Sequence, residues 1–157
     1  AAISSPVPGA NGLRLADLGV ALQRDGSISF DAGRLAALPH IETLRIHTRV
    51  PVADPARVTP ALVAALTLET PLYVCVHANH AAEFTPQAAA ALRALHGAGA
   101  VLLGQSVLLR GVNDSADALE ALFRAMLRHR VKPYYLHALD PAPGTARFAV
   151  PDAEGLA

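Results

Sequence analysis

Residues 102–148 read LLGQSVLLRGVNDSADALEALFRAMLRHRVKPYYLHALDPAPGTARF, and this stretch decides the fold. It contains two strand-like apolar runs, Leu102–Leu109 and Pro133–Leu139, with a helical segment between them. Polar residues follow or interrupt the end of each run. In β/α barrels, polar side chains at the carboxyl ends of buried parallel strands carry the function. The stretch therefore predicts consecutive β/α units with a functional carboxyl edge.

The same unit repeats toward the N-terminus. The predicted strands are Thr43–His47, Leu72–His77, Val101–Leu109 and Lys132–Leu139. Helices are expected after Thr59 and Thr85, each followed by Pro, and after Asn113 or Ser115. Strands that alternate with helices at a spacing of about 30 residues predict a parallel sheet. Because four strands do not close an eight-stranded barrel, we expect an α/β fold with a parallel-stranded partial (β/α) barrel, with a small open sheet as the alternative.

The first 40 residues form a separate segment in this prediction, and residues 41–157 form the barrel part. Residues 1–12 are rich in Pro, Gly and Ser and are typical of a loop. Leu13–Arg24 is expected to form a short helix, followed by a turn at Asp25-Gly26. Asp31 is a candidate N-cap for a second helix that runs to Leu38.

The composition excludes several classes of protein. A hydrophobic content of 52% and a charged fraction of 17% exclude a disordered chain of 157 residues. Thirteen basic and thirteen acidic residues balance, so neither nucleic acid nor an anionic membrane is an expected partner. No apolar run reaches the length of a membrane span. Cys75 is the only cysteine, which favours a reducing, cytoplasmic setting, and the absence of an initial Met suggests a fragment. The oligomeric state is not indicated.

Several polar residues at the strand ends have both a structural and a functional interpretation. His77 and His80 have the spacing of a metal pair, but no third ligand follows at a diagnostic distance, so no metal site is predicted. Gln105 is either a hydrogen-bonded core amide or a site residue. Asn113-Asp114 is typical of a turn and helix cap. Asp140, before a proline, is either a turn initiator or a functional carboxylate.

Five segments resemble the lysine 2,3-aminomutases of the radical S-adenosylmethionine superfamily. These segments are RIHTRVPV (45–52), RVTPALV (57–63), HANHAAEFT (77–85), QSVLLRGVND (105–114) and KPYYLHALD (132–140). Within that family RIHTR, HANHA and YYLHALD are most similar to the branch that makes β-lysine for attachment to elongation factor P. The chain is thus identified as a C-terminal partial segment of a radical S-adenosylmethionine barrel.

The resemblance implies an isomerase that moves the amino group of lysine from C2 to C3, with S-adenosylmethionine, a [4Fe-4S] cluster and pyridoxal phosphate as cofactors. A cofactor must carry such chemistry because no protein side chain supplies the radical. By the same resemblance, Asp140 holds the substrate ε-ammonium, and Arg49, His77 and Gln105 line the cofactor pocket. No catalytic residue is assigned within these 157 residues.

The sequence also departs from the family pattern. The cluster requires three thiolates in a C-x-x-x-C-x-x-C loop, whereas this chain has one cysteine. The lysine that binds pyridoxal phosphate in the family belongs to a Gly-rich segment that is not present, and Lys132 is expected at the opposite edge of the sheet. The chain is therefore expected to be inactive alone, as a fragment of a longer enzyme. The alternative is a degenerate, non-catalytic module that binds an adenosyl or amino-acid ligand.

Overall fold

The computed structural model describes residues 20–22, 28–31, 33–34, 38 and 40–155. The first elements among the described residues are two short strands, β1 (Val20–Leu22) and β2 (Ile28–Phe30), which pair antiparallel. The predicted helix over Leu13–Arg24 is therefore wrong at Val20–Leu22, where antiparallel main-chain pairing with β2 holds the backbone extended. The rest of that helix and the Asp25-Gly26 turn lie outside the described residues.

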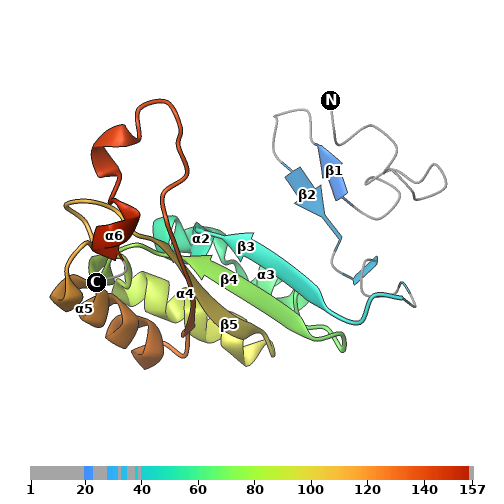
Figure 1. Cartoon of the computed structure of the whole chain (residues 1–157). Coiled ribbons are helices and arrows are strands. Elements are labelled where there is room, and N and C mark those ends of the chain that lie inside the picture. Colours follow the sequence, from blue (N-terminus) through green and yellow to red (C-terminus); the bar gives the residue numbers. More distant parts are fainter. Residues whose placement is uncertain (1–19, 23–27, 32, 35–37, 39, 156–157) are drawn as a thin grey trace.

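A four-stranded parallel sheet forms the centre of the fold (Figure 1). Its strands are β3 (Leu44–Thr48), β4 (Leu72–His77), β5 (Val101–Val107) and β6 (Lys132–His137), and their order in the sheet follows the sequence. The sheet does not close within the described residues. The predicted α/β class and the parallel, partial β/α architecture are thus confirmed.

Helices follow the strands, and three of them begin where the sequence predicts, after Thr59, Thr85 and Ser115. They are α2 (Val50–Ala53), α3 (Pro60–Ala65), α4 (Pro86–Gly97) and α5 (Ala116–Arg128), with short 3-10 turns η3 (Pro55–Arg57) and η4 (Ala81–Glu83). Hydroxyl groups of Thr59, Thr85 and Ser115 accept hydrogen bonds from main-chain N–H groups of α3, α4 and α5. Ser115, and not Asn113, is therefore the N-cap of α5.

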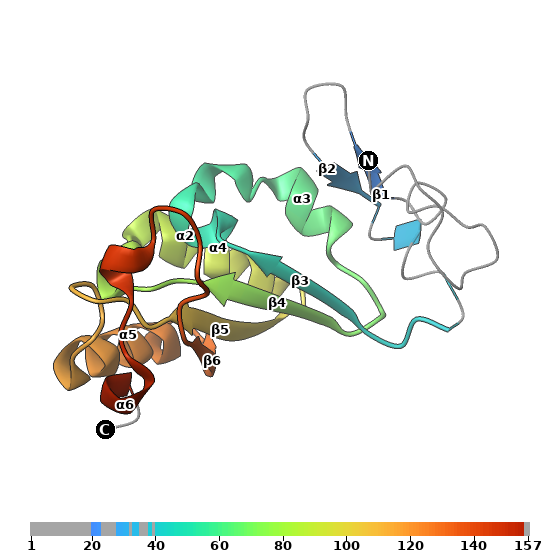
Figure 2. The same cartoon turned by 45° about the horizontal axis from the view of Figure 1, so that its top comes forward.

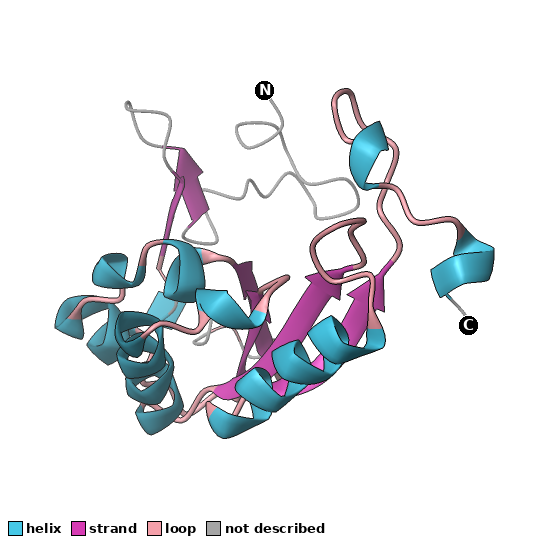
Figure 3. Ribbon diagram, turned by 90° about the vertical axis from the view of Figure 1, so that its left-hand side faces the viewer, coloured by secondary structure: helices cyan, strands magenta, loops and turns pink. Residues whose placement is uncertain are grey.

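The helices pack against one face of the sheet (Figures 2 and 3). This face carries alternate strand residues such as Val74, Val76 and Leu102, which are at most 2% exposed. They pack with Leu92 of α4 and Leu122 of α5, both fully buried. Because side chains alternate along a strand, the intervening residues lie on the opposite face.

We call this opposite face the open face, because no helix of the described part of the chain packs on it (Figure 3). By alternation and register it carries Arg45, His47, Tyr73, Cys75, His77, Leu103, Gln105, Tyr135 and His137. Most of these side chains are polar or aromatic. In a β/α barrel this is the face that lines the interior.

A β-bulge brings one more aromatic ring to the open face. The register between β5 and β6 shifts between Gly104 and Gln105, so that Tyr134 is the extra residue of β6. The Tyr134 ring lies edge-on to Tyr135, with a centroid distance of 4.4 Å. The Arg45 guanidinium carbon lies 5.7 Å from the Tyr134 centroid, although β4 and β5 separate the two strands. A reach across two strands indicates that the open face is concave.

The segment after β6 folds back toward the loop that follows β5. It contains η5 (Ala146–Phe148) and α6 (Asp152–Gly155). Arg110 fixes this segment: its main-chain N–H donates to Phe148 O at 2.9 Å, and its guanidinium pairs with Glu154 at 2.9 Å. In the described part of the chain, no helix combines the length and apolar character needed to cross a membrane.

Candidate functional site

His77 and Gln105 lie side by side on the open face, near the carboxyl ends of β4 and β5. The two residues are register partners in the parallel pairing of these strands. From β3, the ring of His47 reaches Gln105, with 2.9 Å between His47 Nδ1 and Gln105 Oε1. The structure therefore brings together two of the predicted site residues and adds a third, His47.

His77 has a polar atom that no group in the described part of the chain satisfies. Its Nε2 is buried and has no hydrogen-bond partner among the described residues. Burial lowers the pKa of His77 below its usual value of 6.5, and the positive charge of Arg49 lowers the pKa further. A buried, unpaired ring nitrogen is costly unless a ligand or water completes its hydrogen bond. The neutral ring of His77 is thus suited to contact a ligand on the open face.

Arg49 lies just after β3 and pairs with Glu83 of η4. The distance between Arg49 Nη2 and Glu83 Oε2 is 2.8 Å, and the Arg49 side chain is 49% exposed. The other oxygen of Glu83, Oε1, accepts hydrogen bonds from the main-chain N–H groups of Asn79 at 2.6 Å and His80 at 2.9 Å. Glu83 therefore fixes both the loop after β4 and the orientation of Arg49, a role that the sequence pattern did not reveal.

Asp140 lies in the segment directly after β6, at the carboxyl edge of the sheet. Its side chain is exposed and forms no ion pair within the described residues. The structure places Asp140 at the same edge as the ends of β4 and β5. Its role in binding a substrate ammonium group stays a prediction.

Other polar residues at this edge have structural roles. His80 is the N-cap of η4, where its Nδ1 accepts a hydrogen bond from Ala82 N at 3.2 Å. Ser106 donates to Ala78 O at 2.6 Å, and Asn113 donates to Asn79 O at 2.9 Å. The described residues contain no cluster of three or more His, Cys, Asp or Glu side chains that could hold a metal ion.

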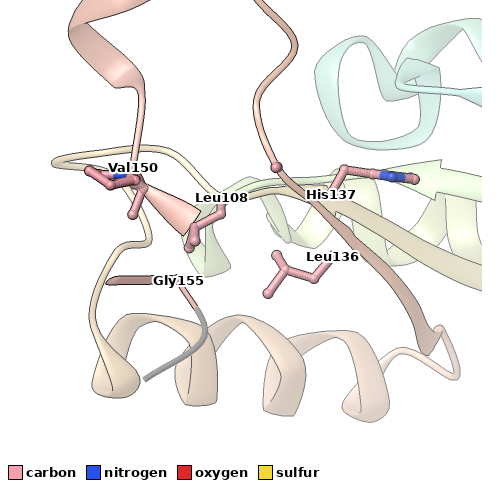
Figure 4. Close-up of a pocket in the computed structure, with 7 residues that line it drawn as sticks. Leu108, Leu136, His137, Val150 and Gly155 are labelled. Carbon is pink, nitrogen blue, oxygen red and sulfur yellow. The ribbon is translucent and has the colours of Figure 1, made fainter. Parts of the chain in front are cut away.

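Two cavities lie at the outer strands of the sheet, and neither His77 nor Gln105 lines them. One, of about 350 Å³, is lined by Leu108, Leu136, His137, Ala138, Val150, Pro151 and Gly155 (Figure 4). Figure 4 shows that Leu136 points toward α5, whereas His137 points the opposite way. The other, of about 330 Å³, lies beside β3 and includes Ile46, Val74 and Leu62 of α3. Their linings are mainly apolar, and neither contains a predicted site residue.

The cofactors implied by the resemblance differ in how well they fit this chain. A [4Fe-4S] cluster does not fit, because Cys75 is the only thiol and is 1% exposed within the sheet. Lys132 is the first residue of β6 and so lies at the amino edge of the sheet, away from Asp140. Ligands held by hydrogen bonds do fit, since the open face offers the unpaired His77 nitrogen and the Gln105 amide.

Sequence reasoning missed the aromatic part of the open face. Regular alternation would place Tyr134 and Tyr135 on opposite faces, but the bulge at Gly104/Gln105 changes this. His137 follows with its ring centroid 5.1 Å from that of Tyr135. A bulge has no reliable sequence signal, and the Tyr-Tyr pair after Pro133 was the only indication.

Comparison with known proteins shows similarity to curated L-lysine 2,3-aminomutases. The protein of that name from Escherichia coli K12 is 43% identical over 134 residues, which are 85% of this chain and 39% of the relative. Proteins of the same name from Clostridium subterminale and Acetoanaerobium sticklandii are 37% and 39% identical, over 86% and 84% of this chain, and in each case over 32% of the relative. The chain therefore spans about a third of the length of the relatives it matches. No protein-family model matches the chain.

Proposed function

Because this chain corresponds to a partial segment of the lysine 2,3-aminomutase family, we propose that it forms the C-terminal part of a radical S-adenosylmethionine barrel that converts lysine to β-lysine. The observation that carries this proposal is the polar, concave open face. On it, the buried and unpaired Nε2 of His77 lies on the strand next to Gln105. Such a surface is expected where a ligand supplies the missing hydrogen-bond partner.

Each site residue has a physical role in the proposal. His77 and Gln105 orient a cofactor through hydrogen bonds on the open face. Arg49 uses the guanidinium N–H groups that are not bound to Glu83 to contact an anionic group of a cofactor. Asp140 selects the substrate by a charge-assisted hydrogen bond to the ε-ammonium of lysine.

The protein groups that bind the iron-sulfur cluster and attach pyridoxal phosphate must lie outside these residues. When bound, S-adenosylmethionine and pyridoxal phosphate supply the radical and the attachment for the migrating amino group. This chain has neither three thiolates nor a lysine at the carboxyl edge. We propose that other parts of the same polypeptide provide them, and that these residues alone are inactive. The RIHTR, HANHA and YYLHALD segments further support the proposal that the β-lysine product is attached to elongation factor P.

The direct test is to read the coding sequence on both sides of this segment and to assay the encoded polypeptide with lysine. We expect a three-cysteine loop upstream, a Gly-rich lysine segment downstream, and β-lysine as product. Asp140→Asn should raise the KM for lysine about tenfold or more, since a charge-assisted hydrogen bond is lost. Asp117→Asn, on the exposed first turn of α5, is the matched control and should not change the KM. A reading frame that lacks the three-cysteine loop or the lysine segment would refute the proposed enzymatic function. Failure of the encoded polypeptide to form β-lysine would refute it as well.

A second candidate, a non-catalytic binding module, is favoured by one observation. The open face is intact, while Cys75 is buried and Lys132 lies at the amino edge. Calorimetry of this chain with S-adenosylmethionine, without iron, tests the module. Binding that Gln105→Leu abolishes, in a chain whose reading frame lacks the cluster cysteines, would support the module over the enzyme.

A further inference from the structure

We propose that His47 is a positioning residue that fixes the side-chain amide of Gln105, so that Gln105 presents its N–H donors to a hydrogen-bond acceptor on the bound ligand. This inference rests on the proposed function, because it takes the open face as the ligand-binding surface. It specifies the ligand chemistry at Gln105: the ligand atom there is a hydrogen-bond acceptor, such as a carboxylate oxygen, a hydroxyl oxygen or an unprotonated ring nitrogen.

The contact between His47 and Gln105 joins two strands that are not neighbours in the sheet. His47 is on β3 and Gln105 is on β5, and β4 lies between these strands. The register partner of His47 on β4 is Cys75, whose side chain is short. His47 and Gln105 can therefore meet across β4 on the concave face, with 2.9 Å between Nδ1 and Oε1.

The contact determines which group of the amide remains for a ligand. Gln105 Oε1 is occupied by His47, so the pair requires a hydrogen on His47 Nδ1. The two N–H donors of the Gln105 amide are then directed elsewhere on the open face. Without His47, the carboxamide could rotate by about 180° and offer its oxygen instead, because the two orientations have the same shape.

A purely structural role explains the contact poorly. His47 is exposed and Gln105 is only partly buried, so a hydrogen bond between them contributes little to folding. The sheet is already held by parallel pairing of β3 with β4 and of β4 with β5. Orientation of the Gln105 amide beside the unpaired His77 nitrogen is the consequence that the contact does have.

The first experiment tests the orientation without any ligand. In ¹⁵N NMR spectra of this chain, at a pH where the ring is neutral, His47 should carry its hydrogen on Nδ1 instead of on Nε2. The Gln105 amide resonances should shift in His47→Leu and stay near the wild type in His47→Asn, whose amide nitrogen is also bonded to Cγ and keeps the donor. His96→Leu, on the exposed side of α4, should leave them unchanged. A hydrogen on Nε2, or equal spectra for His47→Leu and wild type, would overturn the inference.

The second experiment measures the consequence with S-adenosylmethionine as the probe, in the complete polypeptide. His47→Leu should weaken binding about tenfold, the effect of one hydrogen bond, and His47→Asn should restore most of the affinity. In a Gln105→Leu background, His47→Leu should have no further effect, because His47 acts only through Gln105. Additive losses would contradict the positioning role. If wild type does not bind the probe at all, the proposed function fails, whereas the NMR result on His47 still decides the inference.

Discussion

Asn113, in the loop between β5 and α5, donates a hydrogen bond from Nδ2 to the main-chain oxygen of Asn79, 2.9 Å away in the loop after β4. Asn113 Nδ2 also donates to Val107 O at 3.0 Å, and its Oδ1 accepts from Leu109 N at 2.7 Å. The side chain is fully buried. One amide thus joins the carboxyl ends of the two strands that carry His77 and Gln105.

Asn113→Ala should therefore lower the free energy of unfolding by at least about 2 kcal/mol, because each buried main-chain group left unpaired costs about 1–3 kcal/mol. Chemical denaturation of this chain measures the loss. The control is Asp114→Ala: Asp114 is exposed and accepts one hydrogen bond, from Gly111 N at 2.9 Å, so its loss should stay below about 1 kcal/mol. Equal losses in the two variants would show that the buried network is not the cause.

Gly104 allows α5 to approach the sheet closely. A Cβ at this position would lie 2.5 Å from Met126 Sδ and 3.4 Å from Lys132 O. Gly104→Ala should cost about 1–3 kcal/mol in unfolding free energy, since the Met126 side chain must move within a packed core. Gly97→Ala is the matched control because a Cβ at Gly97 meets no atom within 4 Å. A Gly104→Ala chain as stable as wild type would show that Met126 repacks without cost.

His77 should make the stability of the chain depend on pH. Burial and the nearby charge of Arg49 lower the pKa of His77 below 6.5, while Glu83 opposes the shift and His137 adds to it. Below pH 6.5 the unfolded chain then binds a proton that the folded chain does not, so stability falls as the pH decreases through 6.5 toward the folded-state pKa. His77→Gln should reduce this fall.

Denaturant unfolding between about pH 5 and 8 measures the difference between wild type and His77→Gln. The two proteins differ only at residue 77, so the difference between them isolates His77. An NMR titration that places the pKa of His77 at or above 6.5 would contradict the prediction.

Cys75 should be unreactive in the folded chain. Burial raises the pKa of its thiol above the usual 9.0, against the opposing charge of Arg45, and the residue is 1% exposed. Because the thiolate is the reactive form, alkylation by iodoacetamide at neutral pH should be slow in the native chain and fast in urea. Rapid modification of the native chain would show that the open face exposes the thiol, contrary to the structure.

The four strands and the helices α3, α4 and α5 could be predicted because each has a local signal, whereas the short helix α2 was not predicted. Thr59 and Thr85, each before a proline, mark helix starts, and β4 has the predicted bounds Leu72–His77. Contacts between distant elements could not be predicted. The bond from His47 to Gln105 and the pairing of Arg49 with Glu83 depend on the curvature of the sheet and the path of a loop. Near the N-terminus, a strand at Val20–Leu22 replaced the predicted helix because pairing outweighed local propensity.

The one-sided covering of the sheet separates two kinds of constraint along every strand. Packing against the helices constrains residues such as Val74 and Val76. A ligand on the concave side would constrain their neighbours Cys75 and His77 instead. Tolerance to substitution should therefore alternate with a period of two along β4. Substitutions that change ligand specificity can therefore accumulate at every second position of a strand without changing the face that packs against the helices. At the β6 bulge, where Tyr134 and Tyr135 contact each other, this period should break.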